Sequence, residues 1–234
     1  MTSRNRLLPA AAITIGGILT AGAVTAMAGT LTAFRASPQE RRRAMPGDAI
    51  VPEEMYVTTQ AATIAALPER LWPWLAQMGA DRGGWYSYDR VDNDGQPSAR
   101  AILPEYQHVV PGDVFPALPG ATDAFVVAAA QPPHQLVLTG PAGGAPRVSW
   151  AFLLEPRPDG RTRLLVRARV SPQWLDGTGN RTSVPHRRRL IERVYSVLPH
   201  LPAPLLHAAA GFGHRVMQNQ QLRGIKRRAE AEPG

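Results

Sequence analysis

Residues 147–170 read "RVSWAFLLEPRPDGRTRLLVRARV", and this stretch decides the fold. Successive side chains of a β-strand point to opposite faces. Every second residue is apolar in each half of the stretch, first Val148, Trp150, Phe152 and Leu154, then Leu164, Val166, Ala168 and Val170. Pro158-Asp159-Gly160 between them is a hairpin signal. The stretch predicts two antiparallel strands, roughly 147–155 and 161–170, that each turn one apolar face to a core.

Further strand-like runs precede this hairpin. Short turn clusters, such as Pro132-Pro133 and Gly143-Gly144, separate them, and consecutive strands joined by short turns form an antiparallel meander. A β-branched run begins the series after a proline- and charge-rich stretch. The sequence therefore predicts strands at about 55–65, 113–117, 124–130 and 135–140.

Helical periodicity occurs before and after the meander. In residues 68–79, "PERLWPWLAQMG", the apolar residues Leu71, Trp74, Leu75 and Met78 recur at helical spacing. A long final helix is expected at about 203–229, with one stripe along Leu205, Ala209, Phe212, Val216 and Gln220. Residues 171–203 form a proline- and arginine-rich insertion with an expected helix near 185–198. The predicted fold class is α+β, because a long helix with one apolar face needs the sheet to lie on.

Composition excludes some functions. The chain of 234 residues contains no cysteine, so disulfides and thiol catalysis are excluded, and its net charge is +8. The basic triplets, such as Arg187-Arg188-Arg189, accompany no recognition-helix or RNA-binding motif. We therefore interpret them as solvated surface and expect no nucleic-acid partner.

The N-terminal region has an uncharged run over residues 7–34. About 20 apolar residues suffice to cross a bilayer as a helix, so residues 1–35 predict a single-pass transmembrane anchor. The alternative is a signal peptide that is cleaved after Ala28. Arginines that follow the run favour a cytoplasmic globular domain at the cell membrane. Residues 36–54 are expected to be a tether, and residues 55–229 the globular domain.

An aromatic stretch, "ADRGGWYSYDRVDN" at residues 80–93, stands out in a chain with only 5 Trp and 5 Tyr. Gly83 and Gly84 allow a tight turn ahead of Trp85, Tyr86 and Tyr88. Two interpretations remain open. The rings close one end of the core, or some line the mouth of a cavity, where a Tyr hydroxyl orients a ligand. Both require a large concave apolar surface.

The element order, "PERLWPWLAQMG", the stretch "DRGGWYSYD" (residues 81–89) and the ending "VMQNQQLRGIKRRAE" resemble a known family. Over residues 50–229 the chain is similar to the SRPBCC superfamily, the START-like and polyketide-cyclase-like helix-grip proteins of bacteria. The resemblance implies a curved antiparallel sheet around a long C-terminal helix, with an apolar cavity between them. It also implies a hydrophobic ligand such as a lipid, a sterol or a polyketide.

Catalytic and metal-binding motifs are scarce in the sequence. Asp92-Asn93-Asp94-Gly95 does not fit a calcium loop, because Arg90 and Ala101 fall where ligands are required. His207 and His214 are about 10 Å apart along one helix, too far to share a metal. We interpret both histidines as surface residues, and expect neither metal nor cofactor.

The resulting hypothesis is a membrane-tethered domain that binds a hydrophobic small molecule. The alternatives are a cyclase or dehydratase, which would need an acid or base in the cavity, and an adaptor whose cavity is filled by side chains. Asp89, Tyr88 and Arg169 are the candidate acid–base groups. Oligomeric state and ligand identity stay open. The candidate ligand-binding residues are Trp85, Tyr86, Tyr88, Phe125, Trp150, Phe152, Arg169, Phe212, Val216 and Met217.

Overall fold

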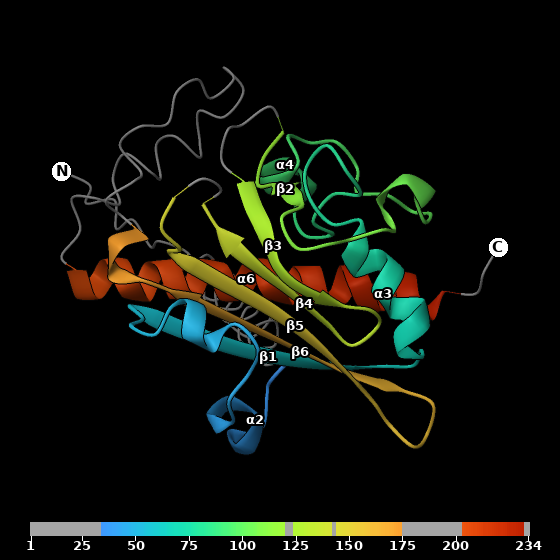
Figure 1. Ribbon diagram of the computed structural model, residues 1–234, viewed down its shortest axis with the longest axis horizontal. Coiled ribbons are helices and arrows are strands. Elements are labelled where there is room, and N and C mark those ends of the chain that lie inside the picture. Colours follow the sequence, from blue (N-terminus) through green and yellow to red (C-terminus); the bar gives the residue numbers. More distant parts are fainter. Residues whose placement is uncertain (1–33, 120–123, 142–143, 175–202, 232–234) are drawn as a thin grey trace, which may run out of the picture. The chain divides into compact units, whose positions relative to one another are not determined.

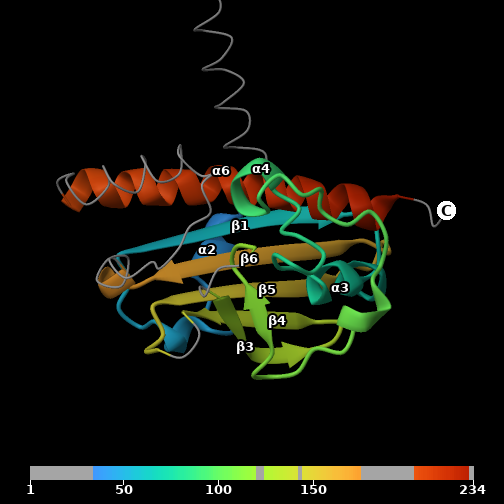
Figure 2. The same ribbon diagram turned by 90° about the horizontal axis from the view of Figure 1, so that it is seen from above.

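A computed structural model describes residues 34–119, 124–141, 144–174 and 203–231. These residues belong to one unit that begins at Phe34. Within them, one curved antiparallel sheet has the strand order β1-β6-β5-β4-β3-β2 (Figures 1 and 2). The predicted meander is confirmed, and the first strand forms one edge of the sheet by pairing with the last. The strands are β1 Tyr56–Ile64, β2 Val114–Pro116, β3 Ala124–Gln131, β4 Gln135–Gly140, β5 Val148–Pro156 and β6 Thr162–Val170.

The hairpin of β5 and β6 has the register that the apolar alternation predicts. Trp150 lies opposite Ala168, Phe152 opposite Val166, and Leu154 opposite Leu164. Both apolar rows therefore stand on one face of the sheet. Phe152, Leu154, Leu164 and Val166 of these rows form the main core together with Leu136 and Leu138 of β4, and Trp150 packs against it.

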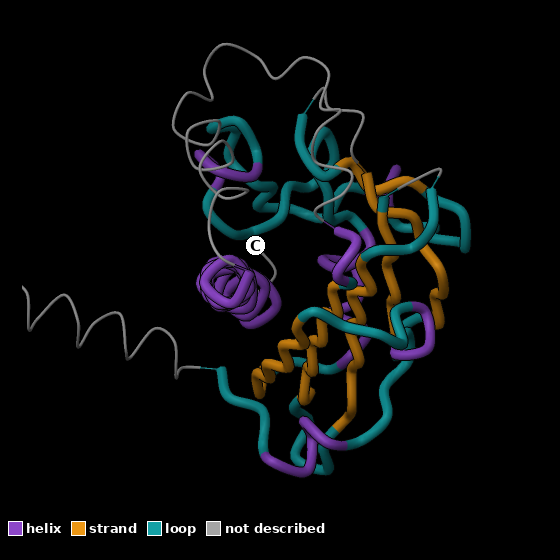
Figure 3. The backbone as a smooth tube through the Cα atoms, turned by 90° about the vertical axis from the view of Figure 1, so that its left-hand side faces the viewer, coloured by secondary structure: helices purple, strands orange, loops and turns teal. Residues whose placement is uncertain are grey.

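The helices are α2 Pro38–Arg42, α3 Pro68–Ala76, α4 Asp89–Asp92 and α6 Ala203–Glu230, with short 3-10 turns at Asp48–Ile50 and Pro104–Tyr106. The long C-terminal helix is confirmed. Figure 3, which looks along α6, shows the sheet curving beside it. This is the helix-grip arrangement that the resemblance implied.

The buried face of α6 differs from the predicted stripe. Leu205 and Phe212 are 58% and 44% exposed, whereas Leu222, Ile225 and Ala229 are buried. The helix is therefore gripped through its C-terminal half, where it meets β1 and α3. A buried hydrogen bond of 2.6 Å from the Gln60 side chain of β1 to Asn219 fixes the crossing.

The expected tether, residues 36–54, is an ordered segment that covers the convex face of the sheet. Met45 and Ala36 pack on this face beside Leu165. Arg167 of β6, only 4% exposed, binds Asp48 at 2.8 Å and donates to the backbone carbonyls of Glu40, Arg41 and Arg43. The charge of this segment, which favoured a solvated linker, instead pairs with outward-facing arginines of β6.

Two predicted regions fall outside the described residues. They are the N-terminal anchor up to Ala33, and residues 175–202 of the insertion with its expected helix. Among the described helices, none combines the length and the apolar character that a bilayer span requires.

Candidate functional site

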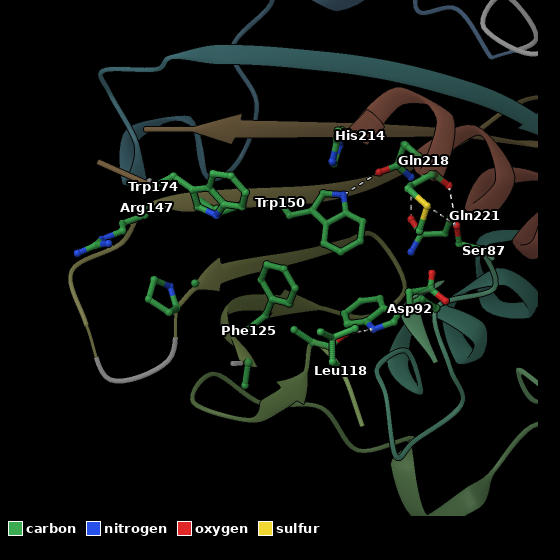
Figure 4. Close-up of a pocket in the computed structure, with 17 residues that line it drawn as sticks. Ser87, Asp92, Leu118, Phe125, Arg147, Trp150, Trp174, His214, Gln218 and Gln221 are labelled. Atoms are coloured by element: carbon green, nitrogen blue, oxygen red, sulfur yellow. Dashed lines mark hydrogen bonds between the residues drawn. The ribbon is translucent and has the colours of Figure 1, made fainter. Parts of the chain in front are cut away.

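A cavity of about 380 Å³ lies between the concave face of the sheet and α6 (Figure 4). Its walls come from β3 and β5, from α6, and from the loops that hold the aromatic stretch and residues 117–118. Figure 4 places Ser87 and Asp92 at one end of the cavity, and Trp174 and Arg147 at the other. Pockets that bind small ligands have volumes of roughly 300–1,000 Å³, so this space suits a small molecule.

Aromatic rings make up one wall. The indoles of Trp85 and Trp150 are stacked with centroids 5.3 Å apart, and Phe125 stands edge-on to Trp85 at 5.7 Å. The ring nitrogens are occupied. Trp85 Nε1 donates to the Ala117 carbonyl at 3.0 Å, and Trp150 Nε1 donates to Gln218 Oε1 at 2.9 Å. The wall therefore offers a ligand ring faces rather than polar groups, which favours flat apolar molecules.

The aromatic stretch is held by close backbone packing. Tyr86 has the left-handed φ of 60°, and its N–H donates to Ser98 Oγ at 3.1 Å. A Cβ at Gly84 would come within 2.4 Å of the same Oγ, and a Cβ at Gly224 within 2.1 Å of the Tyr86 carbonyl oxygen. These glycines let the loop pass directly over α6, and the crossing aims Trp85 at the cavity.

Two side-chain amides of α6 continue the hydrogen bond of the Trp150 indole into a short chain of contacts. Gln218, which accepts from that indole, donates to Gln221 Oε1 at 2.7 Å, and Gln221 in turn contacts Met78 Sδ at 3.7 Å. Ser87 closes the same end by donating to the Met217 carbonyl at 3.0 Å. Each of these groups therefore already has a hydrogen-bond partner within the protein.

Asp92 is different, because it lines the cavity with a free acceptor. Its Oδ1 is buried and has no hydrogen-bond partner in the part of the chain that the structure describes. Burial, with the nearby charge of Asp89, raises the pKa of Asp92 to about 7, and the Ser87 hydroxyl acts in the opposite direction. Near neutral pH this carboxyl is therefore present in both protonation states.

His214 of α6 also lines the cavity, which corrects its interpretation as a surface residue. Its ring lies 6.2 Å from Trp150 and 6.4 Å from Tyr56, measured between centroids. Its Nε2 is buried without a hydrogen-bond partner among the described residues. Burial, aided by the charge of Arg215, lowers the pKa of His214 to about 4, so the imidazole is neutral at physiological pH.

Four of the candidate ligand-binding residues line the cavity. Trp85, Phe125 and Trp150 provide rings, and Met217 provides a flexible side chain from α6. They come from four separate parts of the chain, and the curvature of the sheet brings them together.

The other six lie elsewhere. Tyr86 and Phe152 are buried in the core below the cavity. Tyr88 is 37% exposed and Phe212 44% exposed, so both face solvent. Val216 is partly buried on α6 but does not line the cavity.

Arg169 is the sixth, and it stands on the convex face. There it donates to the Val51 carbonyl at 2.8 Å and pairs with Glu54. The alternation that placed Ala168 and Val170 on the concave face already directs Arg169 to the other side. Arg169, Tyr88 and Asp89 are all absent from the cavity lining, so none of the groups considered as acid or base is positioned there.

Sequence reasoning missed Asp92 and His214 as acid–base groups. Asp92 belongs to an acidic run with two other aspartates, and sequence alone does not show which carboxyl turns inward. His214 has Arg215 as its neighbour, and the predicted stripe of α6 ran along a different face. The one available signal in the sequence was the spacing of Asp89 and Asp92, two acidic residues that lie three positions apart.

Comparison with known proteins finds matches among solved structures, at low sequence identity and low TM-scores. No family model matches the chain, and no curated protein matches it. The solved structures that match the chain include CalU16 from Micromonospora echinospora (15% identity, 74% of this chain and 83% of that one, TM-score 0.32). They also include NE0264 from Nitrosomonas europaea (13%, 79% and 97%, TM-score 0.39) and the Polyketide_cyc-like protein Cgl2372 from Corynebacterium glutamicum (14%, 79% and 100%, TM-score 0.35).

Proposed function

We propose that this chain is a START-like helix-grip protein that binds a hydrophobic small molecule between its sheet and α6. One observation carries the proposal: the cavity of about 380 Å³ is walled by stacked aromatic rings, and most of the residues that line it are apolar. The adaptor alternative requires a cavity filled by side chains, and this one is open. Desolvation of flat apolar surface supplies the binding energy, at about 25 cal/mol per Å² buried.

Titration of the full-length protein with a fluorescent naphthalene dye tests the proposal. Micromolar affinity is expected, which corresponds to about 8 kcal/mol. Met217→Trp should weaken binding, because the larger side chain extends into the cavity from α6. Phe212→Trp is the matched control, since it adds an indole to the same helix at a solvent-exposed position.

The two variants separate cavity binding from adsorption elsewhere. Equal affinities for Met217→Trp and the wild-type protein, with Met217→Trp folded by circular dichroism, would place the dye outside the cavity. Weakening by Phe212→Trp as well would indicate binding to the exposed surface of α6.

The N-terminal run supports a second part of the proposal, attachment to the cell membrane through residues 1–35. The globular domain then lies on the cytoplasmic side, where it can exchange apolar ligands with the bilayer. The full-length protein should sediment with membranes and resist carbonate extraction. A soluble mature chain that begins at Gly29 would show instead that the run is a cleaved signal peptide.

A further inference from the structure

We propose that the cavity also catalyses proton transfer: Asp92 removes a proton from a carbon atom of a flat apolar substrate, and His214 donates a hydrogen bond to the oxygen that gains negative charge. This activity rests on the proposed binding function. It differs from passive binding because it requires two polar groups in defined roles.

The first requirement is a base that can reach a ligand. Asp92 lines the cavity, and its Oδ1 is buried and accepts no hydrogen bond from the described residues. The other nearby carboxylate is structural, because Asp89 accepts from Ser98 Oγ and from the Ser98 N–H at 3.1 Å. Asp92 is thus the carboxyl in the cavity wall that keeps an unpartnered oxygen for a substrate. A carboxylate in an apolar site is a stronger base than one in water, because desolvation destabilises its charge.

The second requirement is a group that stabilises the negative oxygen. His214 Nε2 is buried beside Trp150 with no partner among the described residues. Because burial holds the pKa of His214 near 4, the ring is neutral at pH 7 and carries one N–H. A neutral imidazole can polarise a carbonyl by donating this N–H to the carbonyl oxygen as a hydrogen bond. The proposal places the hydrogen on Nε2, the buried nitrogen.

Other charges around the cavity do not compete for these roles. Arg147 lies at the opposite end of the cavity from Asp92 and extends away from the aromatic rings (Figure 4). Arg215, next to His214, is exposed on α6. The amides of Gln218 and Gln221 are already hydrogen-bonded to each other. Asp92 and His214 are therefore the pair available for proton chemistry among the residues that line the cavity.

The substrate class follows from these two roles and from the aromatic wall. It is an uncharged, flat carbonyl compound with an acidic C–H beside the carbonyl group. The C–H electron pair becomes the C=C bond of an enolate, the carbonyl π pair moves to the oxygen, and the proton passes to Asp92. Where the substrate carries a C=C bond conjugated with the enolate, return of that proton to the far carbon of the conjugated system completes an isomerisation. Return to the same carbon completes an exchange, and neither outcome needs an oxidant or a second substrate.

The base can be tested without the natural substrate by using nitrobenzisoxazole. This flat aromatic loses its ring C–H proton to a base, the N–O bond breaks, and a coloured cyanonitrophenolate forms. The full-length protein should accelerate this reaction with saturation kinetics. Asp92→Asn should lower the rate by at least about 100-fold, the contribution typical of a positioned general base. His214→Phe should lower it less, because it removes only the hydrogen bond to the phenolate oxygen.

Controls separate failure of the chemistry from failure of binding. Asp159→Asn changes an exposed aspartate of the β5–β6 turn and should leave the rate unchanged. Naphthalene-dye affinity is measured on each variant. An Asp92→Asn protein that binds dye normally and keeps the wild-type rate would overturn the catalytic role while leaving the binding function intact. Wild-type protein that binds no dye would overturn the binding function itself.

The pH profile of the wild-type protein provides a test that needs no variant. Only the deprotonated form of Asp92 is a base, so the rate should rise with pH and level off above the pKa of about 7. A rate that continues to rise in proportion to hydroxide would contradict the assignment, because it would indicate that solvent base removes the proton.

Discussion

Replacing Gly224 by alanine should destabilise the protein, although alanine is the better helix former. Gly224 lies on the buried side of α6, where the aromatic stretch crosses the helix. A Cβ placed there falls 2.1 Å from the Tyr86 carbonyl oxygen, whereas real Cβ atoms essentially never approach closer than 3.0 Å. Helix and loop must therefore separate by about 1 Å.

The neighbouring contacts resist this separation. The obstructing atom belongs to the backbone, and Tyr86 is held by its left-handed φ of 60° and by its hydrogen bond to Ser98. Overpacking costs about 1–3 kcal/mol, and a rigid obstacle favours the upper end. Alanine returns about 1 kcal/mol of helix propensity. The net expected loss in the free energy of unfolding is about 2 kcal/mol.

Gly213→Ala is the matched control. It changes the same residue type on the same helix, but nothing lies within 4 Å of the point where its Cβ would stand. It should stabilise the protein by about 1 kcal/mol, since only propensity changes. Urea denaturation of both variants measures the difference, about 3 kcal/mol from these two estimates. Equal stabilisation by both substitutions would refute the close approach of α6 to the aromatic stretch.

Three further outcomes follow from the packing and the charges. Trp85→Ala should lower the free energy of unfolding by about 3–5 kcal/mol, the cost of an emptied aromatic core site, in chemical denaturation; a loss below about 1 kcal/mol would contradict its buried stack. Arg167→Met should cost about 3–5 kcal/mol by removing the buried guanidinium that pairs with Asp48 and by leaving several carbonyls without their donor, and should expose residues 36–54 to protease; an unchanged digestion pattern would contradict the covering role of that segment. The folded-state pKa of Asp92, about 7, lies above the usual 3.8, so the folded protein binds this proton more tightly and loses stability as pH rises from about 4 to 7. Asp92→Asn should therefore melt later than wild type at about pH 8 and equally at about pH 4, and earlier melting at pH 8 would contradict the raised pKa.

The sheet could be predicted from the sequence because strand alternation is a local property. The apolar rows of β5 and β6 report one buried face each, and the turn residues mark where each strand ends. The same rule placed Arg169 on the convex face, although its charge had suggested a ligand contact. The prediction for Arg169 gave its charge more weight than its position in the strand alternation.

The site was less predictable because it depends on contacts between distant segments. His214 is buried only because the sheet curves until Trp150 reaches α6. Asp92 turns inward because the loop that carries it crosses α6 at Gly224. A glycine within a helical stretch of sequence does not by itself predict such a crossing. The covering of the convex face by residues 36–54 likewise depends on the outward arginines of β6, which lie more than a hundred residues further along the chain.

The indole N–H signals of the five tryptophans test the central claim, ligand binding in the cavity, most directly. Trp85, Trp150 and Trp174 line the cavity, whereas Trp72 and Trp74 lie in α3 and do not. In isotope-edited NMR spectra, a naphthalene dye added to the protein should shift the signals of the first three and leave the other two in place. Shifts confined to Trp72 and Trp74, or no shift under conditions where fluorescence shows the dye bound, would contradict binding between the sheet and α6.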